Sequence, residues 1–154
     1  MIHVVLVHPE IPPNTGNVIR LCANTGAQLH LIEPLGFTLE SARLRRAGLD
    51  YHEHASMRVH RSWEEFIVQR RPGRLFALTT SARTRLHDTG FESGDTLVFG
   101  NESSGLPPGI LAHFAPDRRL RLPMRPDNRS LNLSNAVAVA VFEVWRQTGF
   151  DGAA

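Results

Sequence analysis

Short apolar runs alternate along the chain with longer stretches in which apolar and polar residues mix at helical spacing. Continuous apolar runs of about four to eight residues are typical of strands buried on both faces, and the mixed stretches are typical of amphipathic helices. This alternation predicts an α/β fold, with a mostly parallel sheet flanked by helices. The chain has 154 residues, the length of one domain, so we expect residues 1–154 to form a single domain.

The most apolar runs predict the strands, and the mixed stretches predict the helices. We expect strands over residues 3–7, 29–32, 57–59, 75–79, 96–99 and 119–122, of which 57–59 is the weakest. We expect helices over residues 14–25, 39–47, 63–69, 107–112 and 131–147. The last helix is apolar nearly all round, which favours burial in the core or against a second subunit.

The ends of two helices are predicted by individual residues. Asn14 is the expected N-cap of the first helix, and Gly26 is expected to end it. Ser62 is the expected N-cap of the third helix, and Glu65 completes a capping box with it.

Three polar segments follow predicted strands, at the sheet edge where open α/β proteins bind ligands. The first covers residues 14–20 at the start of a helix, and helix N-termini favour anions. Gly16 allows a close backbone approach, and Asn14 and Asn17 offer amide donors and acceptors. Arg20 follows within reach of a ligand bound there. An ordinary capped helix with a surface arginine is the alternative interpretation.

The second and third segments are also candidate ligand loops. Residues 99–107 lack the Gly-Lys-Ser/Thr ending of a P-loop, and Glu102 favours a ligand with hydroxyl or amine donors over a bare phosphate. Residues 122–124 and 130–138 place Ser130 and Asn132 at the mouth of the last helix. Because an unpaired buried polar group costs about 1–3 kcal/mol, these side chains need partners. A Gly-rich connector and ordinary helix capping are the alternatives to a bound ligand.

Composition permits a nucleic-acid partner without requiring one. All 17 basic residues are arginine, and 15 acidic residues leave a net charge of +2. The planar guanidinium suits phosphates and stacks on bases. Codon bias in a GC-rich genome is the alternative explanation for the arginine total, and the net charge is too small to decide between them.

Several other classes of protein are disfavoured. The chain has no apolar run near the roughly 18 residues of a membrane span, so we expect no membrane contact. The first residues lack the charged start and cleavage site of a signal peptide, and the single Cys22 cannot form an intramolecular disulfide. We therefore expect a cytoplasmic protein with Cys22 buried as a small apolar residue. His52 and His54 flank Glu53 but have no evident third ligand, so we expect no metal.

The three polar segments together resemble the motifs of a known family. The matching patterns are Asn14-x-Gly16-Asn17-x-x-Arg20, Phe99-Gly100-Asn101-Glu102-x-x-Gly105-Leu106-Pro107 and Leu122-Pro123-Met124…Ser130-Leu131-Asn132-Leu133-Ser134. They resemble the three motifs of SPOUT-class RNA 2′-O-ribose methyltransferases, over nearly the whole chain. Residues 43–51 and the single-domain length resemble the minimal, TrmL-type branch, which methylates the wobble nucleotide of tRNA, a cytidine or modified uridine at position 34.

The resemblance implies a fold and a cofactor that periodicity does not predict. It implies that the C-terminal segment forms a trefoil knot, and that S-adenosylmethionine is bound there as methyl donor without a metal. The cofactor-binding positions that it implies are Leu78, Thr79, Gly100, Gly105, Leu122, Met124, Ser130 and Leu131.

The resemblance also implies a catalytic set. Arg20 takes the role of general base or of its essential assistant, and Asn14, Glu102 and Asn132 orient the reacting groups. A guanidinium in a protein keeps its proton, so Arg20 could instead polarise the 2′-hydroxyl or hold a phosphate that accepts the hydroxyl proton. Position 142 is Phe, where related minimal members often carry Tyr, so any hydroxyl role there is absent.

The implied partners are tRNA and a second copy of the chain. A 2′-hydroxyl exists only in RNA, and readable bases lie in single-stranded loops such as the anticodon loop. Candidate phosphate contacts, each also compatible with a solvated surface role, are Arg43, Arg45, Arg46, Arg125 and Arg129. The apolar last helix suits a homodimer interface, in which the cofactor of one subunit meets the arginine of the other.

Two alternative functions remain. One is a 2′-O-methyltransferase for another tRNA or rRNA position. The other is a non-catalytic RNA-binding factor of the same fold, although such a factor has no need of Asn14, Arg20, Glu102 and Asn132 together.

Overall fold

The computed structural model describes residues 1–40 and 57–154. These residues form one seven-stranded sheet with the strand order β3-β2-β1-β6-β4-β7-β5, and every described pairing in it is parallel. The strands are β1 (His3–Val7), β2 (Gln28–Ile32), β3 (Met57–His60), β4 (Leu75–Leu78), β5 (Thr84–Arg85), β6 (Thr96–Phe99) and β7 (Arg119–Arg121). The predicted α/β fold with a mostly parallel sheet is confirmed.

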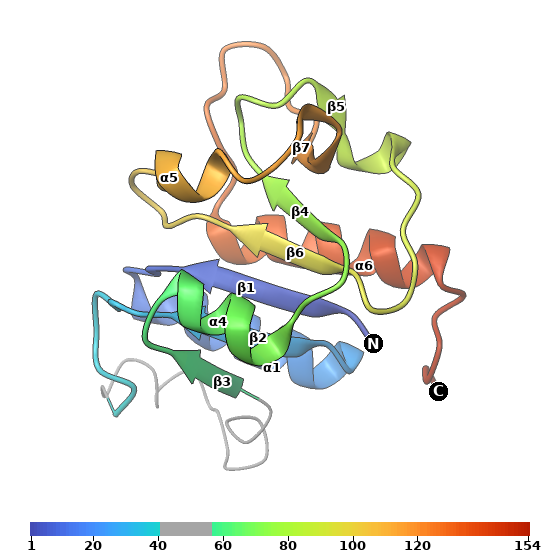
Figure 1. Cartoon of the computed structure of the whole chain (residues 1–154). Helices are drawn as coiled ribbons and strands as arrows, with labels where there is room; N and C mark the ends of the chain where they lie inside the picture. The colour runs from blue at the N-terminus through green and yellow to red at the C-terminus, as the bar shows by residue number, and fades with distance from the viewer. Residues whose placement is uncertain (41–56) are drawn as a thin grey trace.

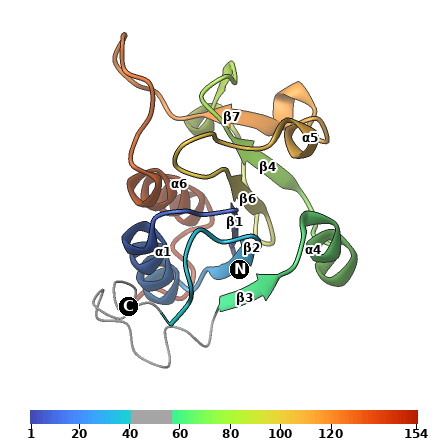
Figure 2. The ribbon, with the colours of Figure 1, turned by 90° about the vertical axis from the view of Figure 1, so that its left-hand side faces the viewer.

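Helices cover both faces of this sheet. They are α1 (Pro12–Thr25), α4 (Trp63–Arg70), α5 (Pro108–Leu111) and α6 (Leu133–Gln147), with short 3₁₀ turns η1 (Leu86–Asp88) and η2 (Pro116–Arg118). Figures 1 and 2 show α1 and α6 side by side on one face, and α4 and α5 on the other. None of the helices in the described ranges combines the length and apolar character that a membrane crossing requires.

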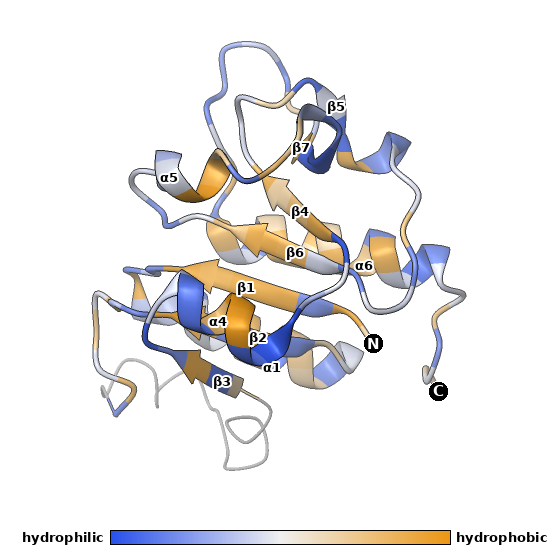
Figure 3. Ribbon diagram, in the orientation of Figure 1, coloured by the Kyte–Doolittle hydropathy of each residue, from blue (hydrophilic) through white to orange (hydrophobic). Residues whose placement is uncertain are grey.

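Burial on both faces explains the continuous apolar strands. Val4 and Leu6 of β1 belong to the core under α1 and α6, whereas Val5 and Val7 belong to the core under α4 and α5. The orange ribbon of β1 and β6 in Figure 3 shows this pattern on the central strands. Cys22 is buried in the first core, as predicted.

The structure corrects the predicted start of the first helix. The helix begins at Pro12, with Ile11 at the N-cap, so the prediction that Asn14 is the N-cap is wrong. Proline is well tolerated in a first turn, because its missing N–H would have had no helical partner. Asn14 thus lies within the first turn and its side chain is available for other contacts. Gly26 ends the helix in the left-handed region, with φ 76°, as predicted.

The other predicted helices and strands differ less from the structure. The Ser62 hydroxyl accepts from the Glu65 N–H at 3.1 Å, which confirms that cap. The last helix begins at Leu133, with Asn132 as its N-cap. Strand β5 has only two residues and was not predicted. Of the helix predicted over residues 39–47, residues 39 and 40 lie in a turn and the rest is outside the described residues. The implied knot stays a prediction.

Candidate functional site

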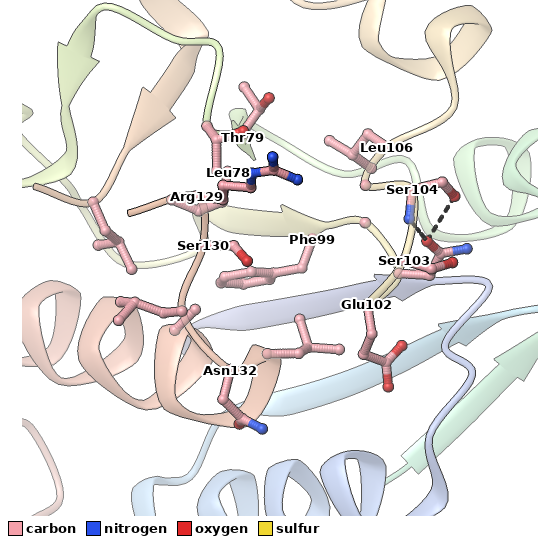
Figure 4. Close-up of a pocket in the computed structure, with 18 of the residues that line it drawn as sticks. Leu78, Thr79, Phe99, Glu102, Ser103, Ser104, Leu106, Arg129, Ser130 and Asn132 are labelled. Atoms are coloured by element: carbon pink, nitrogen blue, oxygen red, sulfur yellow. Dashed lines mark hydrogen bonds between the residues drawn. The ribbon is translucent and has the colours of Figure 1, made fainter. Parts of the chain in front are cut away.

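A cavity of about 740 Å³ lies where the loops after β4, β6 and β7 meet. Figure 4 shows its lining, with Leu78 and Thr79 on one side, Phe99 beneath and Glu102 and Asn132 at the edge. All eight predicted cofactor positions line this one cavity: Leu78, Thr79, Gly100, Gly105, Leu122, Met124, Ser130 and Leu131. Three segments far apart in the sequence therefore form a single site, as expected for strand ends in an open parallel sheet.

The cavity has apolar walls and polar edges. Leu78, Phe99 and Leu122 contribute apolar surface, while Glu102 and Arg129 contribute opposite charges. The sequence interpretation missed several lining residues, including Ile11, Thr80, Ser81 and Leu111. Thr80 and Ser81 directly follow β4, so the strand-end rule could have found them; no comparable signal marks Ile11 and Leu111.

The loop from Gly100 to Gly105 folds back on itself. A Cβ at Gly100 would lie 2.0 Å from the Gly105 carbonyl carbon and 2.1 Å from the Leu106 nitrogen, so only glycine fits there. Gly105 adopts φ 70°, in the left-handed region. Within the loop, the Asn101 Oδ1 accepts from the N–H and the hydroxyl of Ser104, both at 2.8 Å. The result is a closed loop that presents backbone to the cavity.

Glu102 joins this loop to the start of α1. Its Oε1 accepts from the Glu10 N–H at 2.9 Å, and its Oε2 accepts from the Ile11 N–H at 2.8 Å. Oε2 also accepts from the Asn14 side-chain amide at 3.2 Å. One carboxylate therefore supplies acceptors to the chain entering α1, where Ile11 itself provides no side-chain cap.

Asn132 extends the same network to the third segment. Its Nδ2 donates to the Asn14 Oδ1 at 3.0 Å, and its Oδ1 accepts from the Asn135 N–H at 3.2 Å. Asn14, Glu102 and Asn132 are thus brought together. Asn14, the central member of the three, is nearly fully buried. The network links all three motifs at the edge of the cavity.

Arg20 is not brought into this group. It is exposed on α1 and lies outside the set of residues that line the cavity. Of the predicted phosphate contacts, Arg129 lines the cavity and Arg125 is exposed nearby in sequence. Arg43, Arg45 and Arg46 are outside the described residues, as are His52 and His54. Across residues 1–40 and 57–154, no group of three His, Cys, Asp or Glu side chains is placed to hold a metal ion.

A second polar cluster lies beneath α4. The His3 Nδ1 and the His30 Nε2 are 3.2 Å apart, and the His30 Nδ1 and the His60 Nε2 are 3.0 Å apart. The Phe66 ring packs edge-on against both His30 and His60, with ring centroids 5.2 Å apart in each pair. Burial, together with the neighbouring His3 and His60, lowers the pKa of His30 to about 3. Burial and the Arg70 guanidinium also lower the pKa of His3 and His60.

Comparisons with known proteins identify the family. Residues 1–142 match the SpoU rRNA Methylase family. The chain belongs to this family. The resemblance to RNA methyltransferases that the three motifs suggested is therefore confirmed.

Three related proteins match at least 94% of this chain. A tRNA (cytidine(34)-2'-O)-methyltransferase from Burkholderia pseudomallei is 66% identical over 156 residues, covering 100% of this chain and 100% of that protein. A solved structure that concerns the 2-OH methylation of C/U34 on tRNA has a TM-score of 0.88 at 48% identity, covering 96% of this chain and 95% of that one. An AdoMet-bound rRNA methyltransferase from Sinorhizobium meliloti has a TM-score of 0.79 at 26% identity, covering 94% of this chain and 56% of that one.

Proposed function

We propose that this chain transfers a methyl group to the ribose 2′-hydroxyl of nucleotide 34, the wobble nucleotide, of tRNA. The observation that carries the proposal is the 66% identity, over all of both chains, to a relative named for this reaction at cytidine 34. The 48% identical structure concerned with C/U34 extends the substrate to a uridine at the same position. The cavity supports the proposal, because residues from each of the three segments that carry the family resemblance line it together.

The cavity suits S-adenosylmethionine as the methyl donor. Leu78, Phe99 and Leu122 offer apolar walls for an adenine, and the closed loop after β6 offers backbone groups at close approach. Arg129 offers a guanidinium for a carboxylate, a pairing that this side chain makes well. When bound, the cofactor supplies a methyl group on a sulfonium, which is an excellent leaving group. The AdoMet-bound relative supports this assignment.

The protein's task is to align the ribose hydroxyl and to assist loss of its proton. Alignment in a fixed site can contribute up to roughly 7–11 kcal/mol in ideal cases. Asn14, Glu102 and Asn132 hold the cavity edge through their shared hydrogen bonds. We assign Arg20 to the hydroxyl or to the phosphate next to it, as the group that favours proton loss. Since Arg20 does not line the cavity of its own chain, it serves the cavity of a second copy.

A homodimer follows from this assignment. Val139 and Phe142 on α6 and Phe150 beyond it are large apolar side chains that are 43%, 46% and 43% exposed. An isologous contact between two copies of α6 buries such a face. Sedimentation of the purified protein tests this: a dimer is expected, converted toward monomer by Phe142→Asp. A wild-type monomer at assay concentration contradicts it.

The remaining features belong to the same proposal. We place the trefoil knot in the C-terminal segment that lines the cavity, and we assign residues 1–154 to one cytoplasmic domain that acts on the anticodon loop. Family membership and the tRNA substrate named for the full-length relatives support this assignment.

One experiment tests the function. The purified protein is incubated with labelled S-adenosylmethionine and unmodified tRNA, and the labelled nucleotide is mapped. Label on the ribose of nucleotide 34 is expected. Label at another tRNA position or on rRNA replaces this proposal with the alternative target, and no transfer to any RNA excludes an enzyme of this class.

A further inference from the structure

We propose that Glu10 is a positioning residue, which holds the cofactor loop in its binding shape through Ser103. The proposal rests on the proposed function only in taking S-adenosylmethionine as the ligand of the cavity. Glu10 lies between β1 and α1, and Ser103 lies at the tip of the loop from Gly100 to Gly105. Glu10 does not line the cavity, whereas Ser103 does, so Glu10 acts on the site indirectly.

The two segments hold each other by reciprocal bonds. The Glu10 Oε1 accepts from the Ser103 hydroxyl at 2.6 Å and from the Ser103 N–H at 3.2 Å. In return, the Glu102 Oε1 accepts from the Glu10 N–H at 2.9 Å. The segment before α1 thus contributes the Glu10 carboxylate and the N–H groups of Glu10 and Ile11. The loop contributes the Glu102 carboxylate and the N–H and hydroxyl of Ser103. Hydrogen bonds to an ionised acceptor are shorter and stronger than neutral ones, which suits a contact on a partly exposed loop.

Two anchors restrict the loop more than one anchor does. Inside the loop, Asn101 bonds Ser104, which closes the loop but does not orient it against the rest of the molecule. Glu102 attaches the loop to the start of α1 through both of its carboxylate oxygens. The Glu10–Ser103 contact adds a second side-chain anchor on the next residue of the loop, and it restricts the loop tip further.

Glu10 is itself held firmly enough to act as an anchor. The Gly36 N–H donates to the Pro9 carbonyl at 2.9 Å. A Cβ at Gly36 would lie 2.9 Å from the Glu10 Cα, so a third segment packs directly on this backbone. The carboxylate of Glu10 therefore extends from a fixed position toward the loop tip, which explains why an acidic residue outside the cavity can shape the cavity wall.

Cofactor binding by matched variants tests this role. S-adenosylmethionine affinity is measured by calorimetry without RNA, beside the thermal midpoint and the KM and kcat for methyl transfer. Glu10→Ala is expected to weaken cofactor binding and raise its KM about tenfold, with kcat at saturation and thermal midpoint little changed. Glu10→Gln, which keeps an oxygen acceptor, is expected to stay within about threefold of wild type. Glu64→Ala, at an exposed carboxylate on α4, is the control and is expected to match wild type.

Ser103 variants test the route of the effect. Ser103→Ala removes the hydroxyl but keeps the N–H bond to Glu10, so its effect is expected to be smaller than that of Glu10→Ala. The double variant is expected to bind no worse than Glu10→Ala alone, because both changes remove the same contact.

The outcomes separate this proposal from the proposed function. Wild-type cofactor affinity in Glu10→Ala overturns the positioning role, as does a Glu10→Gln variant as weak as Glu10→Ala. Additive losses in the double variant overturn the route through Ser103. Methyl transfer to a nucleotide other than 34 overturns the proposed substrate but leaves the positioning role standing. A wild-type protein that binds no S-adenosylmethionine overturns both.

Discussion

Two clusters of polar side chains in residues 1–40 and 57–154 differ in whether they open on a space for a ligand. Asn14, Glu102 and Asn132 join three loops through bonds of 3.0 and 3.2 Å and border a cavity of about 740 Å³. His3 and His30, in the row that continues to His60, are linked at 3.2 Å across neighbouring strands, but they border a hollow of only about 140 Å³. Both clusters pair polar groups that would be costly to bury alone, although the buried Nδ1 of His60 has no hydrogen-bond partner among the described residues.

The difference lies in what surrounds each cluster. The loop cluster sits where parallel strands end, so its side chains face backbone turns and open space. The histidine row runs across β1, β2 and β3 on one side of the sheet, and Phe66 of α4 packs on His30 and His60. Burial lowers the pKa of all three imidazoles, which favours their uncharged form. A cluster of polar side chains therefore indicates a ligand site only where the fold also leaves space beside it. We expect loop-edge changes to affect chemistry and changes in the histidine row to affect stability.

The largest effect is expected at Arg20. Arg20→Ala is expected to lower kcat by about 10²–10⁴-fold, the range typical of assistance to a proton transfer. S-adenosylmethionine affinity is expected to stay within about twofold, because Arg20 does not line the cavity of its own chain. Single-turnover kinetics and calorimetry measure the two quantities, with the exposed Arg61→Ala as control. Lost cofactor affinity would make Arg20 a binding residue instead.

The next largest effect is expected at Glu102. Glu102→Ala leaves the N–H groups of Glu10 and Ile11 and the Asn14 amide without their acceptor. Losing bonds to a charged acceptor costs about 1.5–3 kcal/mol each, so kcat/KM is expected to fall about 100-fold or more. Glu102→Gln, which keeps one acceptor oxygen, is expected to lose less. Near-wild-type kcat/KM in Glu102→Ala would show that the network does not shape the site.

A smaller effect, on stability alone, is expected in the histidine row. The folded pKa of His30 is lowered to about 3, so between pH 6.5 and 3 the unfolded state binds a proton that the folded state does not. The stability that comes from uncharged His30 is fully present above pH 6.5, and it is lost as the pH falls toward 3. At about 1.4 kcal/mol per pH unit, the free energy of unfolding is expected to fall by roughly 2 kcal/mol between pH 6.5 and 5.

His30→Gln provides the matched test of that effect. The variant lacks the titrating group, so the pH dependence of its urea unfolding is expected to be shallower over the same range. Its methyl transfer at pH 7.5 is expected to stay within about twofold of wild type. An unchanged pH slope, or loss of activity in a folded variant, would contradict the separation of the two clusters.

The smallest effect is expected at Phe142, which belongs to neither cluster. Phe142 is 46% exposed on α6 and packs edge-on against Trp145, with ring centroids 5.6 Å apart. Phe142→Tyr keeps the aromatic ring that the proposed α6 contact uses and adds only a hydroxyl, so kcat/KM is expected to change by less than about twofold. A larger increase in kcat/KM would indicate that the tyrosine hydroxyl of related enzymes has a role that Phe142 cannot perform.

The loop cluster could be predicted from the sequence because its signal is local. Gly100 and Gly105 bracket a polar loop directly after a buried strand, and Ser130 and Asn132 stand before an apolar helix. Such patterns can be recognised in the sequence without knowing which strands pair. The precise contacts did not follow: Asn14 was expected to cap its own helix, whereas its amide binds Glu102 and Asn132.

The histidine row could not be predicted for the opposite reason. His3, His30 and His60 lie on three different strands, and each one interrupts or ends a short apolar run that reads as an ordinary strand. Only the parallel register between these strands brings the imidazoles into line. The placement of Arg20 outside the cavity likewise depends on the direction in which α1 leaves the sheet, which no motif encodes.

Methyl transfer by this protein is expected to depend on one atom of the substrate, the 2′-oxygen of nucleotide 34. Two anticodon stem-loop RNAs are compared that differ only in whether nucleotide 34 carries a 2′-hydroxyl or a hydrogen, each with labelled S-adenosylmethionine and the wild-type protein. One methyl group per molecule of the hydroxyl RNA is expected, and none on its deoxy counterpart. Equal labelling of the two RNAs would contradict this dependence.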